Sequence, residues 1–265
     1  MIPAIHWINV TPRDIIQTEL GNGYRYSGRK EQEDIALFEL LEQHEGESAK
    51  NYVTRVLRYN IVNINLEPGE KIMENDLCGQ FKISRTPIRE AILELSQKHL
   101  IDIYPKRGTY VAYIDPELVE EVRSLRCVLE SELAKNACSI LRPEDIDKLR
   151  ENIAVWRYYM EKSNEKKILE LDKKFHSMIY SMCHKNYWNE LVESIAPQFD
   201  RTIVLSLRCR PTSVILSDHE QLVDAMEEKD GEKAYEIARK HMRRYIENHS
   251  QMVEQYPQYF EMRQV

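Results

Sequence analysis

Hydrophobic residues recur along most of this chain with the spacing of one helix face. Between residues 49 and 64 the apolar positions are Val53, Val56, Leu57 and Ile61, a spacing that predicts an amphipathic helix. Pro68-Gly69 then ends the pattern, as this pair does in turns. Shorter segments of the same kind predict helices at about 74–81 and 86–98, followed by two strands at 101–104 and 109–113.

Beyond residue 116 the pattern is helical throughout. The expected helices cover about 116–139, 143–162, 164–183, 187–208, 213–228 and 231–254. Ile114-Asp115-Pro116 is the expected hinge before them, because the residue before a proline disfavours helix. With no strand pattern or repeat in this part, the helices must bury their apolar faces against one another, which predicts an all-helical bundle.

These elements predict a mainly α protein with an N-terminal winged helix-turn-helix, which is three helices plus a β-wing, and a C-terminal all-α bundle. The expected boundaries are 1–46 for an N-terminal extension, 47–113 for the winged domain, 116–254 for the bundle and 255–265 for a tail. The extension has two open interpretations: a peripheral arm, or an arm that packs on a partner subunit or on DNA. Its aromatic residues Trp7, Tyr24 and Tyr26 favour some packing.

The charge distribution separates the two predicted domains. The chain has a net charge of −7, but residues 50–113 carry 10 Lys and Arg against 7 Asp and Glu, a local excess of +3. A basic segment in an acidic protein indicates a localised nucleic-acid contact. The five scattered cysteines include no CxxC pair, which fits reduced thiols in a cytoplasm. Neither a membrane span nor a secretory signal is expected.

The segment 83–91, Ile-Ser-Arg-Thr-Pro-Ile-Arg-Glu-Ala, has the composition of a DNA-reading helix. Arg85 and Arg89 are four residues apart and share a face, and arginine is the commonest reader of guanine. Short hydroxyls at Ser84 and Thr86 suit phosphate contacts or capping. At the wing, Lys106 and Arg107 are available for phosphates or the minor groove, and Gly108 permits a tight turn. The alternative is that both arginines only form surface ion pairs, with candidate partners Glu90, Glu94 and Asp102.

A second pattern indicates a metal site. Asp172 and His176 are four residues apart on one predicted helix, while His219 and His241 lie in later helices. Three imidazoles and a carboxylate suit a divalent transition metal such as Zn, Ni or Mn. The alternative is that the histidines are capped or solvated and that Asp172 pairs with a neighbouring lysine.

Both segments resemble known families. Pro68-Gly69, the string 84–91 and Arg107-Gly108-Thr109-Tyr110-Val111 are similar to the DNA-binding domain of the GntR regulators. That family often has glycine where Lys82 and His99 stand, and some members have arginine at Asn75, so the turns and the operator sequence stay open. Residues 116–253 resemble the all-helical FCD effector domain through Asp172-Lys-Lys-Phe-His176, the His219 to His241 spacing, and Arg126-x2-Leu-Glu130.

The resemblance implies that Asp172, His176, His219 and His241 are metal ligands. It also implies that Arg126, and with it Arg201, binds an anionic effector; the alternative for Arg126 is a salt bridge to Glu130.

Together these observations predict a cytoplasmic homodimeric transcription regulator. It would bind double-stranded operator DNA, and a small carboxylate or sugar acid bound near the metal would control that binding; the resemblance implies repression. No catalytic residue is assigned and no enzymatic activity is expected. Two alternatives stay open: a metal-dependent enzyme, and a helical interaction protein that responds to no effector.

Overall fold

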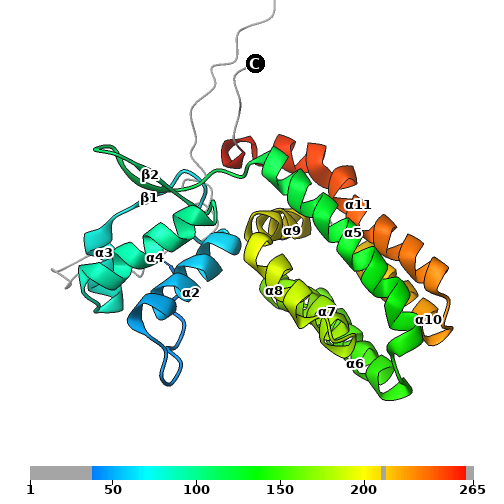
Figure 1. Ribbon diagram of the computed structural model, residues 1–265. Coiled ribbons are helices and arrows are strands. Elements are labelled where there is room, and N and C mark those ends of the chain that lie inside the picture. Colours follow the sequence, from blue (N-terminus) through cyan, green and yellow to red (C-terminus); the bar gives the residue numbers. More distant parts are fainter. Residues whose placement is uncertain (1–37, 210–212, 261–265) are drawn as a thin grey trace, which may run out of the picture. The chain divides into compact units, whose positions relative to one another are not determined.

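Three helices and a small sheet form the first part of the protein in the computed structural model, which describes residues 38–209 and 213–260 (Figure 1). The elements are α2 (Ala49–Val62), β1 (Lys71–Ile72), α3 (Glu74–Phe81), α4 (Arg85–Gln97), β2 (Ile101–Tyr104) and β3 (Gly108–Val111). Ser48 begins α2, and its side chain accepts a hydrogen bond from the backbone N–H of Asn51, which satisfies one of the free donors at a helix start. The predicted three helices and β-wing are confirmed.

The sheet differs from the sequence prediction by one strand. Two strands were expected, and the structure has three, in the antiparallel order β1-β3-β2. Lys71 is paired with Tyr110 across β1 and β3, and Ile101 with Val111 across β2 and β3. A strand of two residues is too short to show the alternation that identifies a strand, which explains why β1 was missed.

The core of this domain comes from the helix faces that the periodicity identified. Val53, Leu57, Ile88, Leu95 and Leu100 are all completely buried. Phe38, before the first helix, joins the same core and packs against Phe81 with ring centroids 5.5 Å apart. The predicted extension therefore contributes at least this residue to the domain, while Trp7, Tyr24 and Tyr26 lie outside the described residues.

Seven helices and a 3-10 turn follow. They are α5 (Pro116–Ile140), α6 (Pro143–Glu161), α7 (Glu165–Met182), α8 (Asn186–Ile195), α9 (Pro197–Cys209), α10 (Ser213–Glu227), α11 (Gly231–Gln255) and η1 (Pro257–Tyr259). The single helix expected over 187–208 was wrong, because it is divided into α8 and α9 at Ala196 and Pro197. Proline has no N–H for the helix ladder and is favoured at a helix start.

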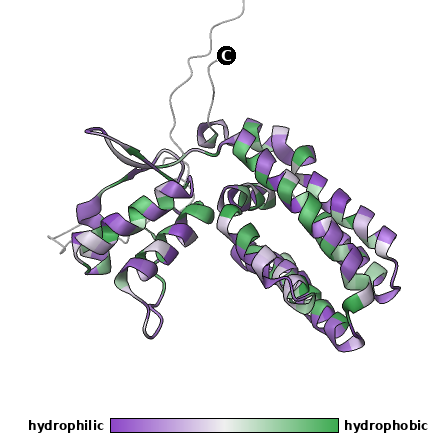
Figure 2. Cartoon of the chain, in the orientation of Figure 1, coloured by the Kyte–Doolittle hydropathy of each residue, from purple (hydrophilic) through white to green (hydrophobic). Residues whose placement is uncertain are grey.

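The bundle buries a large aromatic core. The two longest helices, α5 and α11, pack side by side, and α6 packs on α7 (Figure 1). Trp156, Phe175 and Tyr180 lie in the core between the helices, each at most 1% exposed. Hydrophilic and hydrophobic stretches alternate along each helix (Figure 2), as expected for helices that bury one stripe. The predicted fold class is confirmed.

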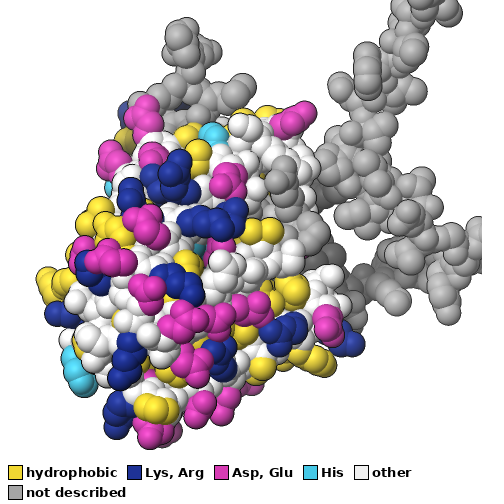
Figure 3. Space-filling model, turned by 90° about the vertical axis from the view of Figure 1, so that its right-hand side faces the viewer, with side chains coloured by type: hydrophobic (Ala, Val, Ile, Leu, Met, Phe, Trp, Pro, Cys, Tyr) yellow, Lys and Arg dark blue, Asp and Glu magenta, His cyan; other side chains and the backbone are white. Residues whose placement is uncertain are grey.

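The surface of the bundle is mixed in charge. On the face drawn in Figure 3, basic and acidic side chains are interspersed. Ion pairs in the helical domain also join side chains of different helices, such as Arg150 with Asp224 and Arg157 with Glu220. A surface with both signs interspersed has little of the single-sign field that attracts nucleic acid.

Candidate functional site

The exposed side of α4 carries the residues predicted to read DNA. Ser84 precedes the helix and makes no side-chain capping hydrogen bond. Ser84, Arg85, Thr86 and Arg89 are all exposed, while Ile88 on the opposite face is buried. The helix therefore presents its first turn and two arginines on an accessible face, which is how a recognition helix meets base edges.

Both arginines are held by side chains of the preceding helix. Arg85 Nη2 donates to Oδ1 of Asn75 at 2.8 Å, and Arg89 Nε donates to Oε2 of Glu74 at 2.9 Å. Glu74 was not among the partners considered from the sequence. These are exposed interactions of small net energy, so the arginines can exchange them for other acceptors.

The wing presents two cations at its tip. Lys106 and Arg107 are exposed, and the turn is closed by a hydrogen bond from the Arg107 N–H to the Tyr104 carbonyl at 3.0 Å. Gly108 has φ of 129°, a conformation that favours glycine, and a Cβ there would lie 3.2 Å from the Lys71 side chain. The sequence therefore places glycine where the wing needs it.

Two of the three departures from the family pattern fall on unusual backbone. Lys82 and His99 have φ of 54° and 56°, in the left-handed region. Glycine adopts this region without steric cost, whereas other residues do so less readily. The turn geometry that glycine would provide is thus kept, with lysine and histidine in its place.

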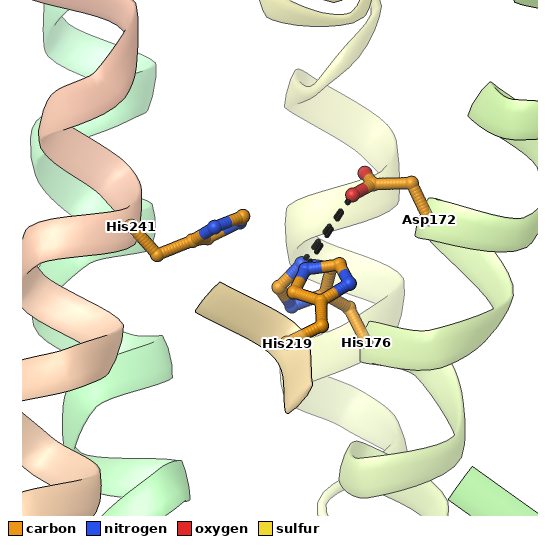
Figure 4. A group of neighbouring side chains, drawn as sticks. All are labelled: Asp172, His176, His219 and His241. Carbon is orange, nitrogen blue, oxygen red and sulfur yellow. Dashed lines mark ion pairs between the residues drawn. The ribbon is translucent and has the colours of Figure 1, made fainter. Parts of the chain in front are cut away.

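Four residues converge inside the helical bundle (Figure 4). Asp172 and His176 come from α7, His219 from α10 and His241 from α11. Each offers one ligand atom, and these atoms all lie within 4.8 Å of one another. Nε2 of His176 lies 3.9 Å and Nε2 of His219 3.7 Å from Oδ1 of Asp172. The structure therefore brings together all four predicted ligands.

The cluster has the polar atoms that a metal would satisfy. Nε2 of His176 and both ring nitrogens of His219 are buried without a hydrogen-bond partner in the described chain. Buried polar groups of this kind are rare unless something unseen binds them. Three imidazoles and one carboxylate are a donor set typical of Zn and related ions, so these residues fit a divalent transition metal.

Aromatic rings fix His219. Phe175 stacks on the imidazole with centroids 4.2 Å apart, and Trp156 contacts it edge-on at 4.7 Å. Burial lowers the pKa of His219 well below its usual value, and the nearby His241 and His176 lower it further. The ring is therefore neutral at pH 7, which is the form that binds metals.

A buried ion pair adjoins the cluster. Arg126 Nε donates to Oε1 of Glu130 at 2.7 Å, and Oε2 of Glu130 lies 2.9 Å from Nδ1 of His176. Burial alone would raise the pKa of Glu130, but the charges of Arg126 and His176 outweigh it and hold the pKa well below its usual range. The salt bridge considered for Arg126 is thus present.

A small cavity opens beside the predicted ligands. Arg126, Asp172 and His241 are part of its wall, together with Arg244. The other lining residues are mostly apolar or carry a hydroxyl or an amide: Phe199, Thr202, Ile203, Ser206, Ile215, Met242 and Asn248. The arrangement combines cations, ligand atoms and an apolar wall in one small space, as expected for a small-molecule site.

Sequence reasoning missed Arg244 in this wall and the carboxylate that holds it. Arg244 donates from Nε and Nη2 to the buried carboxylate of Asp218 at 2.9 and 3.1 Å. Asp218 directly precedes His219, and Arg244 lies one helical turn after His241, so nearness in sequence to a predicted ligand was the available signal.

The structure does not bring Arg201 to this cavity. Its side chain is completely buried, and Nη2 donates to the backbone carbonyl of Ala112, just after β3, at 2.8 Å. Gln198, one turn earlier on α9, donates to the carbonyl of His99, just after α4. Helix α9 thus lines the cavity with Phe199 and Thr202 and holds the winged domain with Gln198 and Arg201.

A winged helix-turn-helix joined to an all-helical bundle is the architecture of a class of DNA-binding transcription regulators. Comparison with protein families agrees: residues 50–111 match the bacterial regulatory proteins of the gntR family, and residues 121–244 match the FCD domain. The chain belongs to the GntR family of transcription regulators, with an FCD domain following its DNA-binding domain.

Individual relatives point the same way. The chain is 26% identical over 209 residues to the transcriptional repressor RspR of Escherichia coli, covering 78% of this chain and 92% of the relative. It is 27% identical to the gluconate operon transcriptional repressor of Bacillus subtilis, covering 66% of this chain and 74% of the relative. The solved structure of E. coli McbR/YncC has the same fold, with a TM-score of 0.67 at 21% identity, covering 79% of this chain and 99% of that one.

These comparisons indicate a transcription regulator rather than an enzyme. Among the described residues, no helix is long and apolar enough to cross a membrane.

Proposed function

We propose that this regulator is a homodimeric repressor in the cytoplasm. A small carboxylate, bound beside a divalent metal in the helical domain, would control its operator binding. The observation that carries the proposal is the position of Arg126, which lines the same cavity as Asp172 and His241. A cation and metal-ligand residues that face one space suit an anionic ligand.

On the DNA, two copies would each place α4 in the major groove of one half-site. Arg85 and Arg89 would contact bases, and Ser84 and Thr86 would contact phosphates at the helix start. Lys106 and Arg107 would extend the contact from the wing. Two relatives are named as repressors, which supports repression as the sign of the response.

In the helical domain, Asp172, His176, His219 and His241 would hold the metal, which is Zn, Ni or Mn by its donor set. When bound, the metal supplies a positive charge that attracts a carboxylate. Arg126 would orient that carboxylate by a charge-assisted hydrogen bond, and the apolar wall would contact the rest of the ligand. A relative named for the gluconate operon supports including sugar acids among the candidates.

The response would pass through α9. The cavity wall and the two carbonyls of the winged domain are contacted by neighbouring residues of this helix. A ligand shifts such an equilibrium only if it binds the two arrangements with different affinity. We therefore expect the effector to bind more weakly to the DNA-bound form than to the free form.

The test is a fluorescence-anisotropy titration of the full chain against the DNA upstream of its own gene, with and without a panel of small carboxylates. Specific binding that one compound abolishes is the expected result. His176→Ala should then lose the bound metal and the effector response while keeping DNA binding. His44→Ala removes an exposed imidazole outside the helical bundle and should change neither.

Other outcomes would favour the alternatives. Turnover of a carboxylate by the metal-loaded protein would indicate a metal-dependent enzyme. Specific DNA binding, with no metal and no ligand-induced melting shift, would indicate a helical domain that responds to no effector. Unchanged metal content in His176→Ala would remove His176 from the site.

A further inference from the structure

Glu130 occupies a position between the metal ligands and the cavity. Its side chain is 5% exposed, and its two oxygens face different groups: Oε1 accepts from Arg126 at 2.7 Å, and Oε2 lies 2.9 Å from Nδ1 of His176. No well-aligned donor reaches Oε2 within the described residues. Nδ1 of His176, at 2.9 Å, is nevertheless close enough to donate to this buried oxygen once the ring is aligned on it.

The position of Oε2 bears on which nitrogen of His176 faces the ligand cluster. A neutral imidazole has one N–H and one lone pair, and a hydrogen bond from one nitrogen leaves the lone pair on the other. A donor hydrogen bond from Nδ1 to Glu130 would put the lone pair on Nε2. Nε2 is the nitrogen that is buried without a partner and lies 3.9 Å from the Asp172 carboxylate.

The other two histidines have no equivalent carboxylate. Nδ1 of His241 is 3.8 Å from Asp218, whose two oxygens already accept from Arg244. His219 is held by the stacked ring of Phe175. Among the three imidazoles, His176 is thus the one whose orientation depends on a carboxylate at hydrogen-bonding distance.

We propose that Glu130 is a positioning residue shared by the metal and the effector. Its Oε2 accepts from Nδ1–H of His176 and directs Nε2 to the metal, while its Oε1 holds Arg126 at the cavity wall. This rests on the proposed metal site and adds a residue that contacts neither the metal nor the effector. Carboxylates that accept from a ligating histidine in this way orient the ring and raise metal affinity.

The first test compares two variants of the same helix for binding of Zn²⁺ alone. Glu130→Gln keeps the size of the side chain but offers one oxygen to two donors, so it cannot serve both Arg126 and His176. We expect its Zn²⁺ dissociation constant, from calorimetry with a competing chelator, to rise by about 10- to 100-fold. Glu120→Gln is the matched control: Glu120 also pairs with an arginine of α5, Arg123, and we expect a change below threefold.

A third variant separates positioning from a general loss of the ion pair. Arg126→Lys keeps the charge beside Glu130 but loses the fork geometry of the guanidinium. Because Oε2 stays available to His176, we expect Zn²⁺ affinity within threefold of the wild type. Equal weakening by Arg126→Lys and Glu130→Gln would overturn the proposal, since it would trace the effect to the pair rather than to His176.

A spectroscopic measurement keeps the proposal testable even if Glu130→Gln does not fold. In the Zn²⁺-loaded wild type labelled with ¹⁵N-histidine, the proposal expects His176 to coordinate through Nε2 and to carry its proton on Nδ1. Coordination of His176 through Nδ1 would overturn it.

The metal site and the role of Glu130 can be overturned separately. If the wild type binds no Zn²⁺, the metal site itself is wrong, and the role of Glu130 falls with it. If the wild type binds one ion per chain and Glu130→Gln binds it within threefold as tightly, the metal site stands and only the role of Glu130 is overturned.

Discussion

The two candidate sites hold their arginines in opposite ways. In the winged domain, the side chain of Arg89 is 61% exposed and pairs with Glu74, which is 32% exposed. In the helical domain, Arg126 and Glu130 are 7% and 5% exposed, and Arg244 pairs with Asp218, which is 1% exposed. The same chemical pair is therefore solvated in one domain and enclosed in the other.

The difference fits the role that we propose for each region. An exposed ion pair is worth about 0–1 kcal/mol, so Arg89 can leave Glu74 for a base at little cost. Losing one member of a buried pair costs about 3–5 kcal/mol, so Arg126 and Arg244 are fixed in place before any ligand arrives. One region is built to exchange its partners, and the other to keep its geometry.

The largest expected effect is on a buried pair. Asp218→Asn removes the carboxylate that receives two hydrogen bonds from Arg244, and we expect the free energy of unfolding at pH 7 to fall by about 3 kcal/mol. Asp224→Asn makes the same change on the same helix, where Asp224 is 49% exposed and pairs with Arg150. That control should lose less than about 1 kcal/mol. Urea denaturation of both variants measures the difference.

The same pair predicts a dependence on pH. Burial opposes ionisation of Asp218, but the neighbouring His241 and the hydrogen bonds and charge of Arg244 outweigh it and lower its pKa from 3.8 to about 2. A carboxylate with a lowered pKa adds stability above the unfolded value, and that stability is lost as the pH falls from 4 through 2. The difference in the free energy of unfolding between the wild type and Asp218→Asn should become smaller from pH 6 to pH 3. A gap that stays constant would contradict this assignment.

The next effect is on binding rather than folding. Arg89→Ala removes an exposed guanidinium, so we expect the free energy of unfolding to change by less than about 0.5 kcal/mol. Affinity for the operator should fall by about 10- to 100-fold, which corresponds to one lost base contact of 1–3 kcal/mol. Anisotropy titrations with operator and scrambled DNA measure the two affinities, and urea denaturation measures the free energy of unfolding.

The comparison of DNA sequences is the control for Arg89. A base-reading arginine should lose much more affinity for the operator than for scrambled DNA, because phosphate contacts are insensitive to sequence. Equal losses on both DNAs would reduce Arg89 to a phosphate contact.

The exposed arginines of α4 and of the wing could be predicted from the sequence because the information that places them is local. Arg85 and Arg89 lie one helical turn apart, and the wing cations Lys106 and Arg107 stand in the turn directly before Gly108. The side chains that pair with Arg85 and Arg89 in the absence of DNA were not predictable. Asn75 and Glu74 reach α4 only because α3 packs against it.

In the helical domain the sequence identified ligands but not their surroundings. Asp172 and His176 share a face by spacing, and the resemblance supported grouping them with His219 and His241, which the structure brings to the same place. The contact of Arg201 with Ala112 spans 89 positions, and spacing within one helix says nothing about such a contact. The expected single helix is divided at Pro197, and Arg201 lies on the second of the two resulting helices, α9.

The smallest expected effect tests whether the exposed pair restrains DNA binding. Glu74→Gln removes the anion that holds Arg89, and we expect operator affinity to increase by about two- to fivefold, the range of a surface ion pair. Glu90→Gln is the matched control, because it removes one exposed negative charge from α4 itself and has no ion pair with a described residue. Both variants change the net charge equally, so the excess gain of Glu74→Gln over Glu90→Gln measures the release of Arg89. If the two gains are equal, general charge accounts for the effect and the Glu74 pair has no role in DNA binding.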